Sequence, residues 1–309
     1  FYTERCEAMR NFANKIWNAS RFLMMNLTID RCELPGRLEL EDKWILSKLN
    51  SVIPEVTENM ERYELGVAAQ KVYDFIWDSY CDWYIELTKT RLQGEDEGAK
   101  LAAQNVLCFV LTELLKLLHP FMPFITEEIY QALPHEEQFI MTSRWPEYRA
   151  DLAFPEEEAA MEAVIATITA IRAEMNVPPS RKAEVLIVTA TPDVYAQGRH
   201  FIQRLAYASE VKFADAAPAD VSGMVTAVTH NATAYLPLSE LVDIAAELER
   251  IRKEIEKAQN GLRGVEQKLS NEKFVSRAPE AVVNAEREKA AKYKELIAKL
   301  EESAKAMQA

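Results

Sequence analysis

The stretch that most constrains the fold runs from Leu107 to Leu133, because one side of it is too apolar to face water. Its apolar residues recur at steps of three and four, the period of one helix face: Leu107, Val110, Leu111, Leu114, Leu115 and Leu118. Pro120 and Pro123 should end this helix, since neither has an N–H to donate. Thr126, followed by two glutamates, indicates the capped start of a second helix. Three aromatic residues are expected to fill the core at this hinge: Phe121, Phe124 and Tyr130.

Three further helical patterns precede this stretch and complete a bundle over residues 1–150. The first covers 4–27, and the second covers 41–63 with a bend or break near Pro54. The third covers 65–91 and is so rich in aromatic side chains that a central place is expected. Four or five helices joined by short loops form an antiparallel bundle.

One face of the first helix carries a second, polar stripe: Asn11, Asn14, Lys15, Asn18 and Arg21. Asparagine is a mediocre helix former, so three of them on one face require a reason. Amide groups can bond to base edges, while Arg and Lys bind phosphates or stack on bases. The alternative is that these residues cap turns or bond neighbouring helices, and the pattern by itself leaves both open.

Charge and cysteine usage limit the other classes of protein. The net charge is −13, but Lys+Arg and Asp+Glu balance in residues 239–309, so a polyanion can bind only at local patches. The four cysteines and four histidines are scattered without metal-ligand spacing, which predicts free thiols and no metal site. No secretion leader and no eighteen-residue apolar run occur, so a cytoplasmic protein without membrane contact is expected.

The second half divides into two regions of different pattern. Residues 151–238 predict a small α+β domain, with a helix from Pro155, strands over 183–190 and 210–215, and a hairpin around His230. Residues 239–309 predict a long antiparallel coiled-coil hairpin, because apolar residues alternate steps of three and four along two limbs. The basic residues outside this seam mark either a solvated face or a rod that follows an RNA backbone. The whole chain is therefore expected to be mainly α.

Three segments of the bundle resemble the anticodon-binding domain of the class I aminoacyl-tRNA synthetases for valine, isoleucine and leucine: RNFANKIWNASRFLMMNL (10–27), SYCDWYIELTK (79–89) and LLKLLHPFMPFITEEIYQAL (114–133). The resemblance implies that part of the bundle meets the anticodon loop of a tRNA. The residues expected on that face are Asn14, Lys15, Asn18, Arg21, Lys43 and Trp44. The HIGH and KMSKS motifs of the family do not occur in the sequence. ATP and magnesium would thus belong to a catalytic domain before Phe1, so no cofactor is expected here and the fragment should be inactive alone.

The final region resembles the C-terminal arm of valyl-tRNA synthetases, which lies against the outer corner (elbow) of tRNA. The segments that carry this likeness are PLSELVDIAAELERIRKEIEKAQ, KLSNEKFVSRAPEAVV and EREKAAKYKELIAKLEE. The arm residues expected to contact tRNA are Arg263, Lys268, Lys273 and Arg277. The implied partners are tRNA(Val) and the catalytic and editing domains of the same polypeptide, in a monomer. The alternatives are a fragment of an isoleucyl or leucyl enzyme, or a non-enzymatic coiled-coil scaffold.

Overall fold

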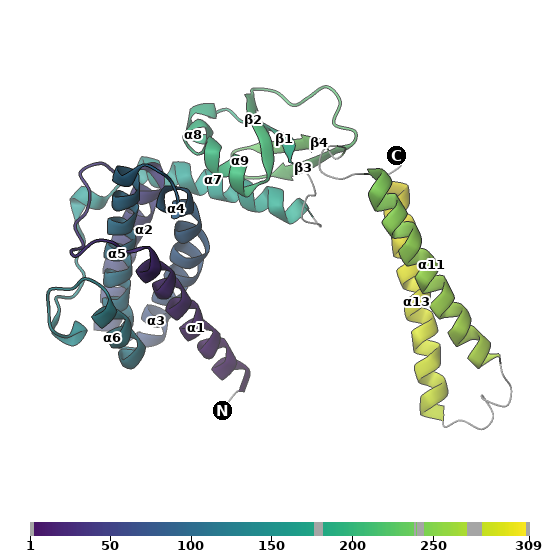
Figure 1. Cartoon of the computed structure of the whole chain (residues 1–309), viewed down its shortest axis with the longest axis horizontal. Helices are drawn as coiled ribbons and strands as arrows, with labels where there is room; N and C mark the ends of the chain where they lie inside the picture. Colours follow the sequence, from purple (N-terminus) through teal and green to yellow (C-terminus); the bar gives the residue numbers. More distant parts are fainter. Residues whose placement is uncertain (1–2, 176–181, 238, 240–243, 271–279, 307–309) are drawn as a thin grey trace. The chain divides into compact units, whose positions relative to one another are not determined.

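The computed structural model describes residues 3–175, 182–237, 239, 244–270 and 280–306 (Figure 1). These residues are mainly helical and include one small mixed sheet, which confirms the predicted fold class at that level. The chain divides into two compact units, which we describe separately. The first comprises residues 1–166 and 193–201, and the second comprises 167–192 and 202–309. The division between residues 166 and 167 falls inside a helix, α7 (Pro155–Glu174).

The first unit is built on the predicted helices. They are α1 (Thr3–Asn26), α2 (Leu40–Glu61), α3 (Leu65–Asp74), η1 (Phe75–Tyr84), α4 (Ile85–Leu92), α5 (Glu97–Leu118) and α6 (Pro123–Ala132), followed by the short turns η2 (Ile140–Thr142) and η3 (Ala150–Leu152). α2 continues through Pro54 without a break. α3, η1 and α4 follow one another directly, so the predicted helix over 65–91 is confirmed, with a π-helical middle segment.

The centre of the bundle is α5, which contacts α1, α2, α3, α4 and α6. All six apolar residues of its predicted stripe are buried. By length and apolar composition alone α5 could cross a membrane, but 61% of its most apolar window is buried inside the bundle. We therefore assign α5 as the core helix of this unit, as its periodicity predicts.

The hinge between α5 and α6 differs from the prediction in two respects. α6 begins at Pro123, and Thr126 is fully buried inside it, where its hydroxyl donates to the Met122 carbonyl at 2.9 Å. Thr126 therefore stabilises the first turn of α6 through this hydrogen bond and is not the N-cap residue of the helix. Phe124 is 91% exposed, so its predicted place in the core is wrong, whereas Tyr130 is buried as expected. Helical period places Phe124 on the side of α6 opposite the buried residues.

The second unit contains a four-stranded sheet with the order β2-β1-β4-β3. β1 (Ala183–Val188) pairs parallel with β2 (Ala208–Ala214) and antiparallel with β4 (Thr233–Pro237). β3 (Met224–Val228) pairs antiparallel with β4, which confirms the predicted hairpin. The segment between β1 and β2 carries two short helices, α8 (Pro192–Gln197) and α9 (Arg199–Leu205), of which the sequence predicted the second.

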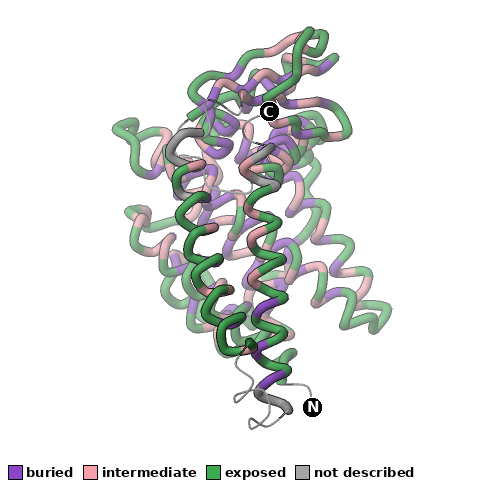
Figure 2. Tube along the Cα trace, turned by 90° about the vertical axis from the view of Figure 1, so that its right-hand side faces the viewer, coloured by how far each residue is buried: buried purple, intermediate pink, exposed green. Residues whose placement is uncertain are grey.

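Two long helices follow, α11 (Ile244–Leu269) and α13 (Glu280–Ala306), and they lie side by side (Figure 1). Their pairing is antiparallel, because Gly261 faces Tyr293 while Lys268 faces Glu286. Both helices are largely exposed, as the green tubes at the front of Figure 2 show. The buried positions follow the predicted seam: Ile251, Ala258 and Val265 on α11, and Val283, Glu286 and Ala290 on α13.

Candidate nucleic-acid interface

The exposed face of α1 carries the polar residues that the sequence singled out. Asn14, Asn18 and Arg21 are exposed, while Phe12 and Ile16 on the opposite face are buried. This arrangement follows from the helical period, since residues three and four apart share a side. The side chains therefore have no packing role within the bundle, which favours a surface for a partner over the alternative of helix-to-helix bonding.

Trp17 belongs to the same face and was missed by the sequence reasoning. Its side chain is 44% exposed, and it stands three residues after Asn14 and four before Arg21. We call Asn14, Trp17, Asn18 and Arg21 the α1 stripe. A half-exposed indole ring offers a flat surface on which a nucleic-acid base can stack. The available signal was its spacing from Asn14 and Arg21, which places it outside the apolar face.

Lys15 lies at the margin of this face and already has partners inside the bundle. Its ammonium nitrogen is 2.6 Å from Asp82 Oδ1 and 3.7 Å from the centroid of the Trp77 ring. These contacts attach α1 to η1, and Asp82 offsets the charge of the lysine. Lys15 is thus a weaker candidate for phosphate binding than Arg21.

The two predicted residues on α2 are held within the bundle. Lys43 Nζ lies 2.7 Å from Glu157 Oε1 in the first turn of α7, and this contact holds the pKa of Glu157 below its ordinary value. Trp44 is only 2% exposed. The prediction that Trp44 meets RNA is therefore corrected, because its ring could stack on a base only if the core opened. Spacing separates Trp17 from the apolar face of α1, but it carries no such information for Trp44, because α2 is buried on several sides between Glu41 and Asn50.

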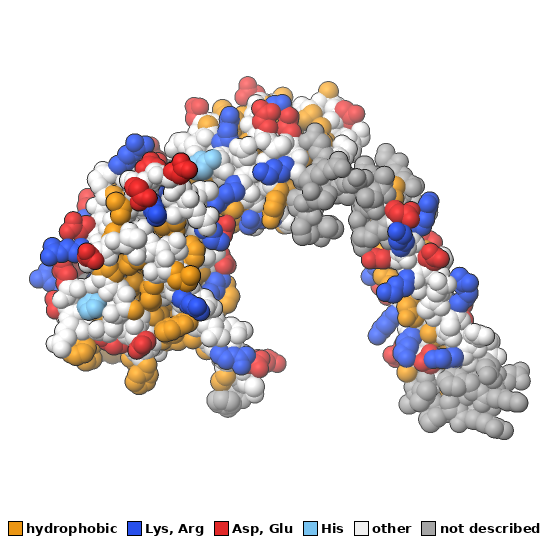
Figure 3. Space-filling model, viewed as in Figure 1, with side chains coloured by type: hydrophobic (Ala, Val, Ile, Leu, Met, Phe, Trp, Pro, Cys, Tyr) orange, Lys and Arg blue, Asp and Glu red, His pale blue; other side chains and the backbone are white. Residues whose placement is uncertain are grey.

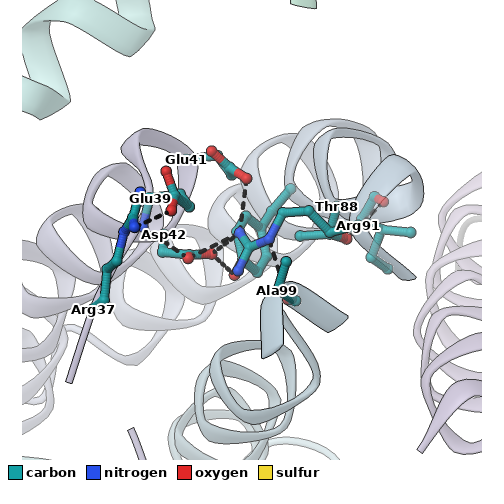
Figure 4. Close-up of polar contacts among 9 residues, drawn as sticks. Arg37, Glu39, Glu41, Asp42, Thr88, Arg91 and Ala99 are labelled. Carbon is teal, nitrogen blue, oxygen red and sulfur yellow. Dashed lines mark hydrogen bonds and ion pairs between the residues drawn. The ribbon is translucent and has the colours of Figure 1, made fainter. Parts of the chain in front are cut away.

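A buried ionic network fixes the start of α2 against α4 (Figure 4). Arg91 Nη1 lies 2.7 Å from Glu41 Oε1 and 2.8 Å from Asp42 Oδ1, and the Tyr84 hydroxyl donates to Asp42 at 2.7 Å. The Arg91 Nε group also donates to the Ala99 carbonyl of α5 at 3.4 Å. Burial of ions is tolerated when each charge has close partners. This network joins three helices of the bundle and was not predicted from sequence.

The sequence also predicts a second tRNA contact, through the C-terminal arm. Two of its four predicted residues, Arg263 and Lys268, lie on α11, and both are exposed. Five positions separate them, which is about 140° around a helix, so they occupy different sides. Lys268 Nζ is 3.9 Å from Glu286 Oε1 on α13. Lys273 and Arg277 lie outside the described residues. Figure 3 shows Lys and Arg side chains interspersed with acids along this helix pair.

Comparison with known proteins relates two regions of the chain to tRNA, and the first of these matches begins at residue 42, after α1. Residues 42–187 match the family described as the anticodon-binding domain of tRNA ligase, and residues 243–308 match the valyl tRNA synthetase tRNA binding arm. The chain thus carries two tRNA-binding elements of an aminoacyl-tRNA ligase.

Curated relatives identify the family. The chain is 49% identical to a valine–tRNA ligase of Clostridium acetobutylicum over 98% of its own length and 35% of the relative. It is 50% identical to that of Clostridium perfringens over 100% and 36%, and 41% identical to that of Bacillus subtilis over 95% and 34%. The chain belongs to the valyl-tRNA synthetase family and spans about a third of the length of these relatives. The predicted family is confirmed.

Proposed function

We propose that this chain binds tRNA(Val) at two places and is part of an enzyme that joins valine to that tRNA. One observation carries the proposal: a single chain contains both an anticodon-binding domain and a valyl tRNA-binding arm. In the proposed parent reaction, ATP, L-valine and tRNA(Val) yield Val-tRNA(Val), AMP and diphosphate. ATP and magnesium would be held by a catalytic domain elsewhere in the polypeptide, into which an editing domain would be inserted. By this proposal the chain supplies placement and specificity in the cytoplasm and has no ligase activity by itself.

The bundle would read the anticodon loop through the α1 stripe. The ring of Trp17 would stack on a base, and the amides of Asn14 and Asn18 would bond to base edges, since an amide both donates and accepts. Arg21 would bind phosphate. Lys15 is already paired with Asp82 of η1, which would hold the stripe in place, and Lys43 of α2 is paired with Glu157 of α7. Both lysines would add positive charge to the bundle.

The helix pair α11–α13 would form a coiled-coil arm that contacts the outer corner of the tRNA. The apolar seam lies between its own two helices, which leaves no seam for a second chain and supports a monomer. We propose that the functional divisions are 1–150, 151–238 and 239–309, with the small α+β region joining the two tRNA-binding elements. Sedimentation at several protein concentrations should show a single monomeric species, whereas a concentration-dependent dimer would favour a scaffold role.

Footprinting of tRNA(Val) by this 309-residue chain tests the function directly. Protection from cleavage is expected at two separate places, the anticodon loop and the outer corner. A tRNA of the same length with another anticodon serves as the control and should lose the anticodon footprint. Equal protection of both tRNAs, or protection at neither place, would contradict the proposal.

A further inference from the structure

We propose that one side of the α11–α13 pair, which we call the glycine edge, is the face that receives the RNA backbone. The inference rests on the proposed function and specifies which side of the arm performs it. The glycine edge comprises Lys257, Gly261, Gly264 and Lys268 on α11, with Lys289 and Tyr293 on α13.

Tyr293 accounts for one of the two glycines. A Cβ atom added at Gly261 would lie 2.7 Å from Tyr293 Cζ and 3.0 Å from the tyrosine oxygen, closer than such atoms can approach. The ring therefore rests directly on the α11 backbone. Tyr293 is partly exposed there, so that its hydroxyl can bond to a phosphate or a ribose 2′-hydroxyl.

Gly264 has no such explanation among the residues that the structure describes. A Cβ atom at this position would find nothing within 4 Å, although glycine weakens a helix interior. Gly264 stands three residues after Gly261, so the two share a side of α11. The bare backbone beside Tyr293 leaves room for a bulky partner to approach α11 closely. A nucleic-acid strand is such a partner, and this region matches a tRNA-binding family.

Lysines stand on both sides of this gap. Lys257 precedes Gly261 by four residues and Lys268 follows Gly264 by four, which places all of them on one side of the helix. The two lysines are eleven positions apart, which corresponds to about 16 Å along the helix. Both lysines are exposed, and positive charges at that separation can bind phosphates a few nucleotides apart on one strand, on either side of the gap.

The acid at this edge is neutralised within the protein. Glu286 is 8% exposed, and its Oε1 lies 3.0 Å from Lys289 Nζ and 3.9 Å from Lys268 Nζ. The side chain of Lys268 is 62% exposed and that of Lys289 is 59% exposed. Two cations therefore face solvent, while the carboxylate that they share is buried. Lys257 adds a third cation. Glu254 stands three residues before Lys257 and is a second acid on this side of α11. Three lysines against two acids leave the edge weakly positive in a chain that is acidic as a whole.

The other side of the helix pair has a different character. There Lys294 Nζ lies 2.9 Å from Glu266 Oε1, and both groups are exposed, so that the acid faces solvent as well. Arg263 is three residues before Glu266 and shares its side. The sequence predicts that Arg263 contacts tRNA, but the present proposal places it outside the binding face. Arg263 therefore provides a matched control, because it is an exposed cation on the same helix, six residues after Lys257 and on a different side of α11.

The test measures binding of the 309-residue chain to tRNA(Val) by fluorescence anisotropy between 50 and 200 mM salt, for Lys257→Gln and Arg263→Gln. Loss of one phosphate contact lowers the salt slope by about one, so the affinity ratio of wild type to Lys257→Gln should change about 3.5-fold over that range. Arg263→Gln should keep the wild-type slope. The inference is overturned if Arg263→Gln loses the slope and Lys257→Gln keeps it, or if both variants behave as wild type.

A second pair of measurements separates binding from folding. Gly264→Ala should raise the helix content of the arm by circular dichroism, because alanine is the better helix former, yet lower tRNA affinity several-fold by filling the gap. A rise in helicity with unchanged affinity would show that no strand approaches Gly264. Failure of the wild-type chain to bind tRNA(Val) at any salt would instead refute the proposed function itself, so the two failures are distinguishable.

Discussion

Replacement of Arg91 by methionine should destabilise the bundle far more than removal of an ordinary surface cation. Among the described residues, Arg91 is the only cation within ion-pair distance of Glu41 and Asp42. Both carboxylates are buried, with 3% and 0% of their surface exposed. Removing one partner of a buried ion network leaves an uncompensated charge and costs about 3–5 kcal/mol. The free energy of unfolding should fall by about that amount at pH 7.

The loss should depend on pH in a definite direction. Burial raises the pKa of Glu41 above its ordinary value even with Arg91 present, and the pKa should rise further without the guanidinium. A group whose pKa is raised in the folded state binds its proton more tightly there than in the unfolded chain. The folded state is then favoured as the pH falls. The deficit of Arg91→Met should therefore shrink between pH 7 and pH 4.5.

Tryptophan fluorescence during urea unfolding is the suitable assay, because all five tryptophans lie in the first compact unit. Arg62→Met is the matched control, since Arg62 pairs with Glu58 on the surface, where both groups are more than half exposed. Such pairs contribute about 0–1 kcal/mol. Equal losses for the two variants, or a deficit for Arg91→Met that grows toward acid pH, would refute the reasoning.

Three other changes test separate features of the structure. Tyr63 has a φ of 60° and is 88% exposed, so Tyr63→Gly should stabilise the bundle by about 0.5–1 kcal/mol in the same urea assay, and a loss would show that the ring makes contacts that matter. Gly261→Ala should lower the thermal stability of the arm by about 1–3 kcal/mol, because the new methyl group meets Tyr293, and unchanged melting by circular dichroism would contradict that packing. Trp17→Ala should weaken tRNA(Val) binding by about 1–3 kcal/mol under conditions in which the urea curve shows the variant to be folded, and unchanged affinity would remove Trp17 from the interface.

The sequence by itself determined the helices and their buried faces. The stripe on α5, the polar face of α1 and the seam of α11 all follow from residues three and four apart, which the helix places on one side whatever surrounds it. The strands β1, β2 and the β3–β4 hairpin were likewise found from alternation and turn residues. The family resemblance was also visible in the sequence, because it rests on contiguous segments and needs no knowledge of contacts between distant residues.

Only the tertiary structure decided whether a given helical residue packs in the core or faces solvent. Trp17 and Trp44 both stand on helices, but one faces solvent and the other the core, because different helices cover them. The contact between Arg91 and Asp42 joins positions 49 residues apart, a separation at which no local period gives information. The same holds for Gly261, whose neighbour Tyr293 is fixed by the antiparallel pairing of α11 and α13. A helix fixes the direction of each side chain relative to its own axis, but what lies in that direction depends on the rest of the chain.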